Sequence, residues 1–455
     1  MIISDIFLLR TYTPLILAIL SIITFPISSG ASIIRDTEVE ASLRDVVDPI
    51  LKAANLSPQS VQIYIVNDSE INAYVAGGQN IFINTGLLRL SDNPSMLMGV
   101  VAHETGHISG GHLARGANDY KSTVMKSTVG FLLGLAASAA GSPDAGQAII
   151  AGTSHIANRE LLKHTRVQEE SADQAALAYL DKIGYSAQGL LDLLEILYKK
   201  ENTLYDKRNP YTLTHPLSRE RMDYVKSHLQ TTTKTHAIPQ AVIERYTLSI
   251  VKLMAFLDEP RTVLTRYPLS DHSTKARYAR VIAYYRIPDL PHALAEIDSL
   301  IKDYPTNPYY IELKGQILFE TGHVAEAIPC YEAAKRLLPQ ASLIKIELAN
   351  TYLATEDNTH AQAAIDNLEQ ALPKEKESAF IWRQLAVAYG RSGQLGMSNL
   401  ALAEEALLQN DIPTAEQFLR RADPLITPKS PAAFRRQDIL AAVARAKQLH
   451  KKPTP

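Results

Sequence analysis

The chain has 455 residues, a formal net charge of −2 and a single cysteine, Cys330. At about 150 residues per domain, this length predicts two or three domains, and the near-neutral charge gives no indication of nucleic acid as a partner. One cysteine excludes an intramolecular disulfide and cysteine-rich zinc sites. It is also an unattractive nucleophile, because it falls in a helical repeat far from other candidate groups, so we interpret it as a small buried hydrophobe.

The N-terminus is predicted to be an export signal. Arg10 provides a positive start, which Asp5 weakens, and residues 14–27 form an apolar run of about the length of a signal core. Small residues at 29–31 predict cleavage after Ala31 and delivery outside the cytosol, which in a Gram-negative cell means the periplasm. An uncleaved anchor is the alternative, although the run is short for a membrane span of about 20 residues.

Residues 33–56 carry apolar side chains at helical spacing and predict a helix. Two β-branched runs, 61–66 and 81–84, predict strands, and the glycines between apolar runs predict a hairpin or a bulged edge. An extended peptide could pair with such an edge and be held across a neighbouring metal ion. An ordinary hairpin is the alternative. The residues predicted to bind substrate in this way are Ala76, Gly77, Gly78, Asn80 and Ile81.

The next predicted helix begins at Asn93-Pro94-Ser95 and ends near Gly110-Gly111. It carries the pattern His103-Glu104-Thr105-Gly106-His107. Histidines four residues apart share one helix face, so both rings can reach one metal ion, usually zinc. Glu104 is placed to hold the attacking water and take its proton. The preceding residues are apolar all round, which predicts burial; the alternative is a chance pattern on an ordinary helix.

A third ligand is predicted downstream. His112 is one position short of the spacing at which some zinc enzymes take a third histidine, so we expect it beside the site or on the surface. Glu169 and Asp173 are four residues apart on another predicted helix. Glu169 can complete a His-His-Glu set with one position open for water, and Asp173 can accept the free N–H of a ligand histidine. A solvated acidic face is the alternative, and Glu170 fits it.

Between these two helices, residues 129–151 are rich in alanine, glycine and aliphatic side chains. A break at residues 141–144 leaves halves that are each too short to cross a bilayer. We therefore predict a buried helical hairpin that covers the site. The alternative is a lid, or a surface that touches a membrane or unfolded substrate.

The ligand pattern, with residues 72–78, 85–88 and 214–216, resembles the gluzincin metallopeptidases, the family that includes HtpX and the CAAX prenyl endopeptidase. It is most similar to a secreted bacterial branch of that family, over residues 33–228 and the repeats that follow. The resemblance implies one zinc ion per chain and a periplasmic protease with chaperone-like activity. Its implied partners are unfolded or misassembled outer-membrane proteins.

His215 is followed by Pro216, which holds residue 215 in an extended conformation outside any helix. With the resemblance, this predicts a loop histidine delivered to the zinc site. It could donate to the oxyanion that forms when the carbonyl is attacked. It could instead fill the open zinc position and keep the enzyme latent, or simply lie on the surface.

Residues 229–246 are predicted to form a linker, and the remainder is helical and repetitive. Small, aromatic and terminating residues recur with the 34-residue period of tetratricopeptide repeats, with about three extra residues before Trp382. Such helix pairs stack into a solenoid whose concave face grips a peptide or a partner protein. The clearest unit carries Gly315, Gly322, Ala327, Tyr331, Ala334 and Pro339.

The sequence therefore predicts a mostly α protein with a small β-sheet: an α+β zincin-type metalloprotease domain followed by an α-solenoid. The predicted parts are a signal peptide (1–31), a metallopeptidase (32–228), a linker with a connecting helix (229–270) and repeats (271–455). The predicted function is a periplasmic zinc endopeptidase in outer-membrane protein assembly and quality control. Its repeats would dock on the assembly machinery, with peripheral membrane contact. The alternative is a non-catalytic adaptor with a structural or latent zinc site, against which the intact Glu104 argues.

Overall fold

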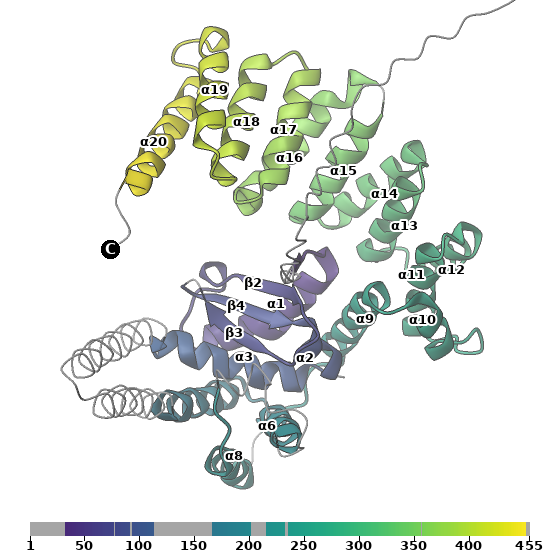
Figure 1. The fold of residues 1–455 in the computed structure, drawn as a ribbon. Coiled ribbons are helices and arrows are strands. Elements are labelled where there is room, and N and C mark those ends of the chain that lie inside the picture. The colour runs from purple at the N-terminus through teal and green to yellow at the C-terminus, as the bar shows by residue number, and fades with distance from the viewer. Residues whose placement is uncertain are drawn as a thin grey trace, which may run out of the picture.

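The computed structural model describes residues 32–76, 78–91, 93–112, 166–201, 215–232, 235–355 and 357–451. The predicted export signal, the apolar stretch 129–151 and Gly77 lie outside these residues. Figure 1 shows one small sheet packed against helices, and an array of helix pairs that arches above it. The predicted fold class, mostly α with a small sheet and a helical-repeat region, is confirmed.

Four strands form a sheet in the order β1-β2-β4-β3. β4 pairs in parallel with β2 and antiparallel with β3, so β3 and β4 form the predicted hairpin. Gly78 in the connecting turn has φ +100°, a conformation that glycine adopts without strain. The strands are β1 (Ser32–Ile34), β2 (Ile63–Asn67), β3 (Ala73–Ala76) and β4 (Asn80–Asn84).

The first predicted helix is shorter than expected. Residues 32–34 form β1, which pairs antiparallel with β2, and the helix α1 (Thr37–Ala53) begins only after Asp36. The Asp36 side chain accepts a hydrogen bond from the Val39 N–H and so caps the helix. The apolar residues 33 and 34 fitted the spacing of a helix, but in the structure they belong to β1 and pair with β2.

The helix α3 (Pro94–Ser109) has the predicted bounds, because Asn93 caps its first turn and Gly111, with φ +62°, follows its end. Its buried side chains share one core with α1, the sheet and a helix that includes residues 166–183. The other described helices of this part are α2 (Thr85–Leu90), α6 (Gln188–Glu201) and α8 (Arg219–Thr231).

The predicted linker is wrong at both ends. The helix α8 continues to Thr231, and α9 (Gln240–Leu257) is already helical where a linker was expected. One side of α9, including Tyr246 and Leu253, packs in the core of the N-terminal part. Another side, including Ala255, packs in the core that begins the repeats. The helix α9 has apolar residues on two faces because it packs in two cores. It therefore belongs to the N-terminal part and to the first repeats at once.

The helix pairs follow the predicted period. Their first helices begin at residues 274, 308, 342 and 379, so two steps of 34 residues are followed by one of 37. The longer step contains the short 3-10 helix at Asn358–His360. The helices are α10 (Pro260–Arg266), α11 (Thr274–Arg286), α12 (Leu290–Asp303), α13 (Pro308–Glu320), α14 (Val324–Leu337), α15 (Ser342–Ala354), α16 (Ala361–Glu375), α17 (Ala379–Arg391), α18 (Leu395–Leu408), α19 (Ile412–Ala422) and α20 (Pro431–Lys451).

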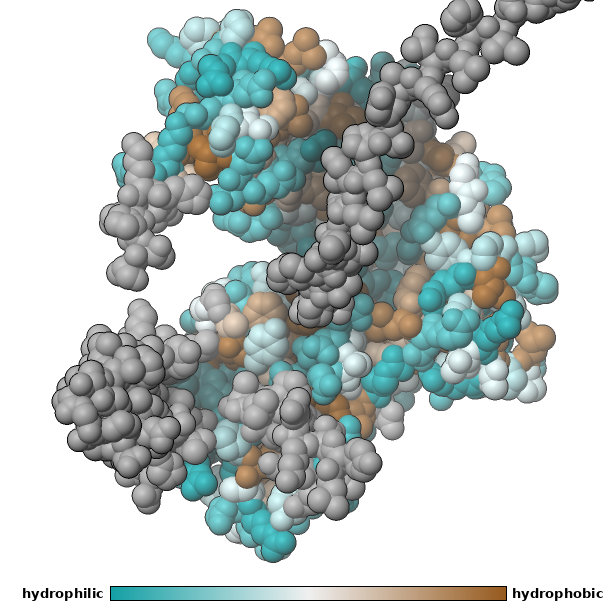
Figure 2. Space-filling model, in the orientation of Figure 1, coloured by the Kyte–Doolittle hydropathy of each residue, from teal (hydrophilic) through white to brown (hydrophobic). Residues whose placement is uncertain are grey.

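Cys330 lies in α14 and is half-buried against the core of the repeats, rather than fully buried as expected. Figure 2 shows a surface of mixed hydrophilic and hydrophobic residues, with an open hollow between the later repeats and the part of the molecule that holds the sheet. Among the described residues, no helix has both the length and the apolar character that a membrane span requires.

Candidate metal centre

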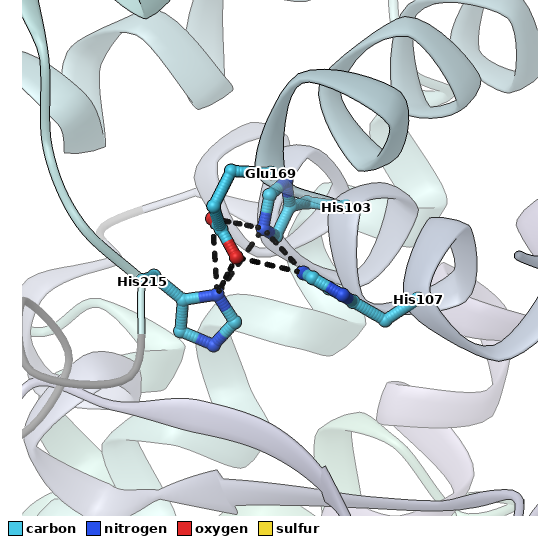
Figure 3. A group of neighbouring side chains, drawn as sticks. All are labelled: His103, His107, Glu169 and His215. Carbon is cyan, nitrogen blue, oxygen red and sulfur yellow. Dashed lines mark hydrogen bonds and ion pairs between the residues drawn. The ribbon is translucent and has the colours of Figure 1, made fainter. Parts of the chain in front are cut away.

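Four buried side chains point toward one another (Figure 3). His103 and His107 come from α3, Glu169 from the helix that includes residues 166–183, and His215 from the segment before α8. Each offers one ligand atom, and these atoms all lie within 4.8 Å of one another. The structure thus brings together the three predicted ligands and His215.

The two helices can cross closely only because of Gly106. A Cβ atom at this position would lie 2.7 Å from the carbonyl oxygen of Ala172, nearer than real Cβ atoms come to a backbone atom. The crossing places the Glu169 carboxylate 3.3 Å from both the His103 Nε2 and the His107 Nε2. Gly106, between the two histidines of the motif, therefore allows the third ligand to reach the site.

The donor set fits a catalytic zinc ion. Two imidazoles and one carboxylate, with a further position for water or substrate, are the ligands of one class of zinc peptidase. The Nε2 atoms of His103 and His107 lie 3.1 Å apart and both face Glu169, while their Nδ1 atoms face away toward other partners. Burial opposes the charge on Glu169, but its histidine neighbours outweigh this and hold its pKa far below the usual range.

Glu104 points into the same site. It is almost fully buried, its Oε1 accepts no hydrogen bond from the described residues, and that atom lies 3.6 Å from His215 Nε2. Burial raises the pKa of its carboxyl group to about 7. A divalent cation held by the histidines would lower this pKa, because it favours the carboxylate. A buried carboxylate oxygen beside the metal position is what a general base requires.

Asp173 holds the first ligand histidine, as predicted. Its Oδ1 accepts a hydrogen bond from His103 Nδ1 at 2.8 Å, which leaves Nε2 for the metal. Burial alone would raise the pKa of Asp173, but the bonds from His103 and Arg221 lower it to about 2. The carboxylate therefore stays ionised and keeps the ring in one orientation.

Arg221, in the first turn of α8, is a site residue for which the sequence predicted no role. Its Nε and Nη2 donate to the two oxygens of Asp173 at 2.6 and 2.9 Å, and its Nη1 lies 2.9 Å from Glu169 Oε2. Only 4 % of this arginine is exposed, and it also donates to the Pro216 carbonyl. The sequence shows only that an arginine follows His215 by six residues, and this spacing does not reveal that its partners are Asp173 and Glu169.

His112 contacts the second ligand histidine from outside the ligand set. Its Nδ1 lies 2.9 Å from the Nδ1 of His107, and only 6 % of the residue is exposed. A histidine that binds metal through Nε2 carries its proton on Nδ1. With a metal on its Nε2, His107 would donate and His112 would accept. The two ligand histidines would then have different acceptors, a carboxylate for His103 and an imidazole for His107.

The predicted substrate edge is partly wrong. Ile81 lies in β4, which pairs with strands on both sides, and it is fully buried, so it cannot offer backbone to a peptide. Asn80 lies at the start of β4, opposite Ala76. Among the described residues, β1 and β3 are the edge strands of the sheet, and β3 is the one that packs beside α3. Gly78 lies in the turn at its end, and Gly77 is outside the described residues.

Comparison with known proteins agrees with this geometry. Residues 37–229 match peptidase family M48. The chain is a metalloprotease whose N-terminal part resembles that family. It is 25 % identical over 401 residues to the beta-barrel assembly-enhancing protease of Escherichia coli, covering 86 % of this chain and 80 % of that one. The protein of the same name from Yersinia pestis is 25 % identical over 403 residues, covering 87 % and 81 %.

A shorter relative matches the N-terminal part alone. Metalloprotease YcaL of Escherichia coli is 26 % identical over 181 residues, covering 38 % of this chain and 64 % of that one. The resemblance expected from the ligand pattern is therefore confirmed. Zinc, the metal of M48 peptidases, suits the ligand set.

Replacing Gly106 with alanine should weaken the metal centre, because the added methyl group forces α3 away from the helix that carries Glu169. We expect a loss of about 1–3 kcal/mol in the free energy of unfolding and reduced zinc content, measured by denaturation and metal analysis. Gly390→Ala is the control, since its Cβ would meet its nearest neighbour at 3.6 Å. Equal behaviour of the two variants would contradict the role of the crossing.

Replacing His112 with alanine should leave the Nδ1–H of His107 without its acceptor. Loss of such a partner typically lowers metal affinity about 10- to 100-fold, which competition with a chelator would measure. His112→Asn keeps an acceptor oxygen and should recover most of the affinity. Unchanged affinity in His112→Ala would show that the contact does not orient His107.

Proposed function

We propose that this protein is a periplasmic zinc endopeptidase that acts in the assembly and quality control of outer-membrane proteins. The observation that carries the enzymatic part is the buried His-His-Glu set with Glu104 beside it. The biological part is supported by relatives named for beta-barrel assembly, which this chain matches over 86 % of its length. The predicted export signal supports the compartment.

The residues of this chain divide the chemistry between them. His103, His107 and Glu169 would hold zinc, which polarises the scissile carbonyl and makes water a nucleophile near neutral pH. Glu104 takes the proton of the attacking water and passes it to the leaving nitrogen. Asp173 and Arg221 do not touch substrate: they fix the orientation of His103 and Glu169.

His215 is proposed to block the site rather than assist it. Its Nδ1 lies 3.1 Å from Glu169 Oε1 and 3.4 Å from His103 Nε2, at the position a fourth ligand would take. Burial lowers the pKa of the His215 ring, which favours the neutral form that binds metals. Water and substrate need that position, so the segment that carries His215 has to move before hydrolysis.

The edge of β3 is proposed to align the substrate. An extended chain that added to this edge would run beside α3, where the ligand histidines lie. Such a requirement selects unfolded or unassembled strands, because a strand already paired in a barrel has no free backbone. The repeats are proposed to bring the protease to the assembly machinery.

A second candidate function keeps the same site without the catalysis. The position of His215 allows a closed, four-ligand zinc site, which is the arrangement of structural zinc. The protein would then be an adaptor that works through its repeats. The activity of two variants separates these candidates.

Glu104→Gln should abolish cleavage of casein and of an unfolded outer-membrane barrel protein, because the amide cannot take the proton of water. Loss of a general base costs about 10²–10⁴ in rate. Zinc content should stay near that of the wild type, since Glu104 is not a ligand. Cleavage that survives in Glu104→Gln would refute the peptidase mechanism.

His215→Ala should cleave the same substrates faster than the wild type, because the fourth position becomes available for water. The double variant His215→Ala/Glu104→Gln is the control and should be inactive. A complete loss of activity in His215→Ala alone would instead assign His215 as the donor to the oxyanion.

A further inference from the structure

Residues 35–38, between β1 and the first turn of α1, lie against the repeat array. The Arg35 guanidinium donates to both oxygens of Glu375, at the end of α16, at 2.8 and 2.9 Å. Glu375 also accepts a hydrogen bond from Ser342 Oγ, at the start of α15, at 2.7 Å. This bidentate pair joins residues that are 340 positions apart in the chain.

The following residues contact the earlier repeats. Thr37 Oγ1 donates to Glu312 Oε1 in α13 at 2.9 Å, and the Tyr278 hydroxyl in α11 donates to Glu38 Oε2 at 2.6 Å. Lys252 in α9 lies 2.8 Å from Asp36 Oδ2. Each residue from 35 to 38 therefore has a polar partner in α9 or in the repeats beyond it.

The partners beyond α9 belong to three successive helix pairs. Tyr278 lies in α11, Glu312 in α13 and Glu375 at the end of α16. In a solenoid, each repeat contacts only its neighbours, and ligands bind across the face that several repeats build. A segment from outside the array that contacts three successive repeats is placed as a bound peptide would be.

The contact between residues 35–38 and the repeats is mainly between charged groups. Burial opposes the charge of Lys252, but Asp36, Glu38 and Glu312 outweigh this and raise its pKa. The Arg35 side chain is 42 % exposed, whereas that of Lys252 is 3 % exposed, so a competing ligand can reach the arginine end of the segment first.

A cavity of about 400 Å³ lies beside this contact, between α1, α9 and the start of α13. It is lined in part by Glu38, Ser42, Tyr304 and Tyr309.

We infer that residues 35–38 are an internal ligand of the repeat array, and that partner proteins reach this face by displacing them. The partner chemistry that fits is a segment with a basic residue followed three positions later by a carboxylate, which reproduces Arg35 and Glu38. An internal segment has an effective concentration on the order of millimolar, so a weaker competitor binds only after the internal contacts are loosened. The exchange does not depend on whether the metal centre cleaves peptides.

The test uses a fluorescein-labelled synthetic peptide with the sequence of residues 32–40 and the purified full chain. In Arg35→Gln/Thr37→Ala, the internal ligand loses two of its contacts, and the peptide should bind at least ten-fold tighter than to the wild type by fluorescence anisotropy. Arg44→Gln is the matched control, because its hydrogen bonds stay within the N-terminal part. It should bind the peptide as weakly as the wild type.

Two further measurements keep the inference open to refutation. Adding Glu375→Gln to Arg35→Gln/Thr37→Ala removes the negative charge and one of the two acceptor oxygens that bind the arginine, and should abolish the gain in binding. Thr37→Ala alone, which disturbs the fold least, should give a smaller gain in the same direction. Circular dichroism checks that each variant is folded. Equal peptide binding by the wild type and the folded variants, or a gain that survives Glu375→Gln, would overturn the assignment.

Discussion

The catalytic centre depends on the close crossing of two helices at Gly106. Without a side chain at this position, the backbone of α3 meets the carbonyl of Ala172, and the Glu169 carboxylate comes within 3.3 Å of both ligand histidines. Everything else at the site supports this crossing. The sheet and α1 bury one side of α3, and α6 and α9 share the same core. A centre made by two packed helices is rigid, which is what keeps three ligands in register.

The sequence predicted the parts of the site that repeat along a helix. His103 and His107, or Glu169 and Asp173, are each one turn apart, so their shared face follows from helical geometry alone. Arg221 and the acceptor role of His112 had no such pattern. Both depend on which segments the fold brings together, and a single arginine in a helix indicates nothing about a partner 48 positions away. The same reason explains β1, whose apolar residues fit a helix until their pairing with β2 is known.

The two ligand histidines are held with different strength. His103 donates to an ionised carboxylate that Arg221 also binds, whereas His107 donates to the neutral nitrogen of another histidine. Hydrogen bonds to charged acceptors are roughly twice as strong as those between neutral groups. The site therefore has one firmly oriented ligand and one that yields more readily. That asymmetry suits the proposed mechanism, in which His215 leaves the site before a substrate enters.

The helix α9 contributes side chains to the core of the protease domain and to the first core of the repeats. A rigid rod built into both bodies leaves no joint at their boundary, so the parts do not swing as separate units. The repeat array can instead bend through small rotations between successive helix pairs, which add up along its length. A force on the distal repeats, such as that from a bound partner, would then be transmitted to α9 and from there to α3, which carries the two histidines.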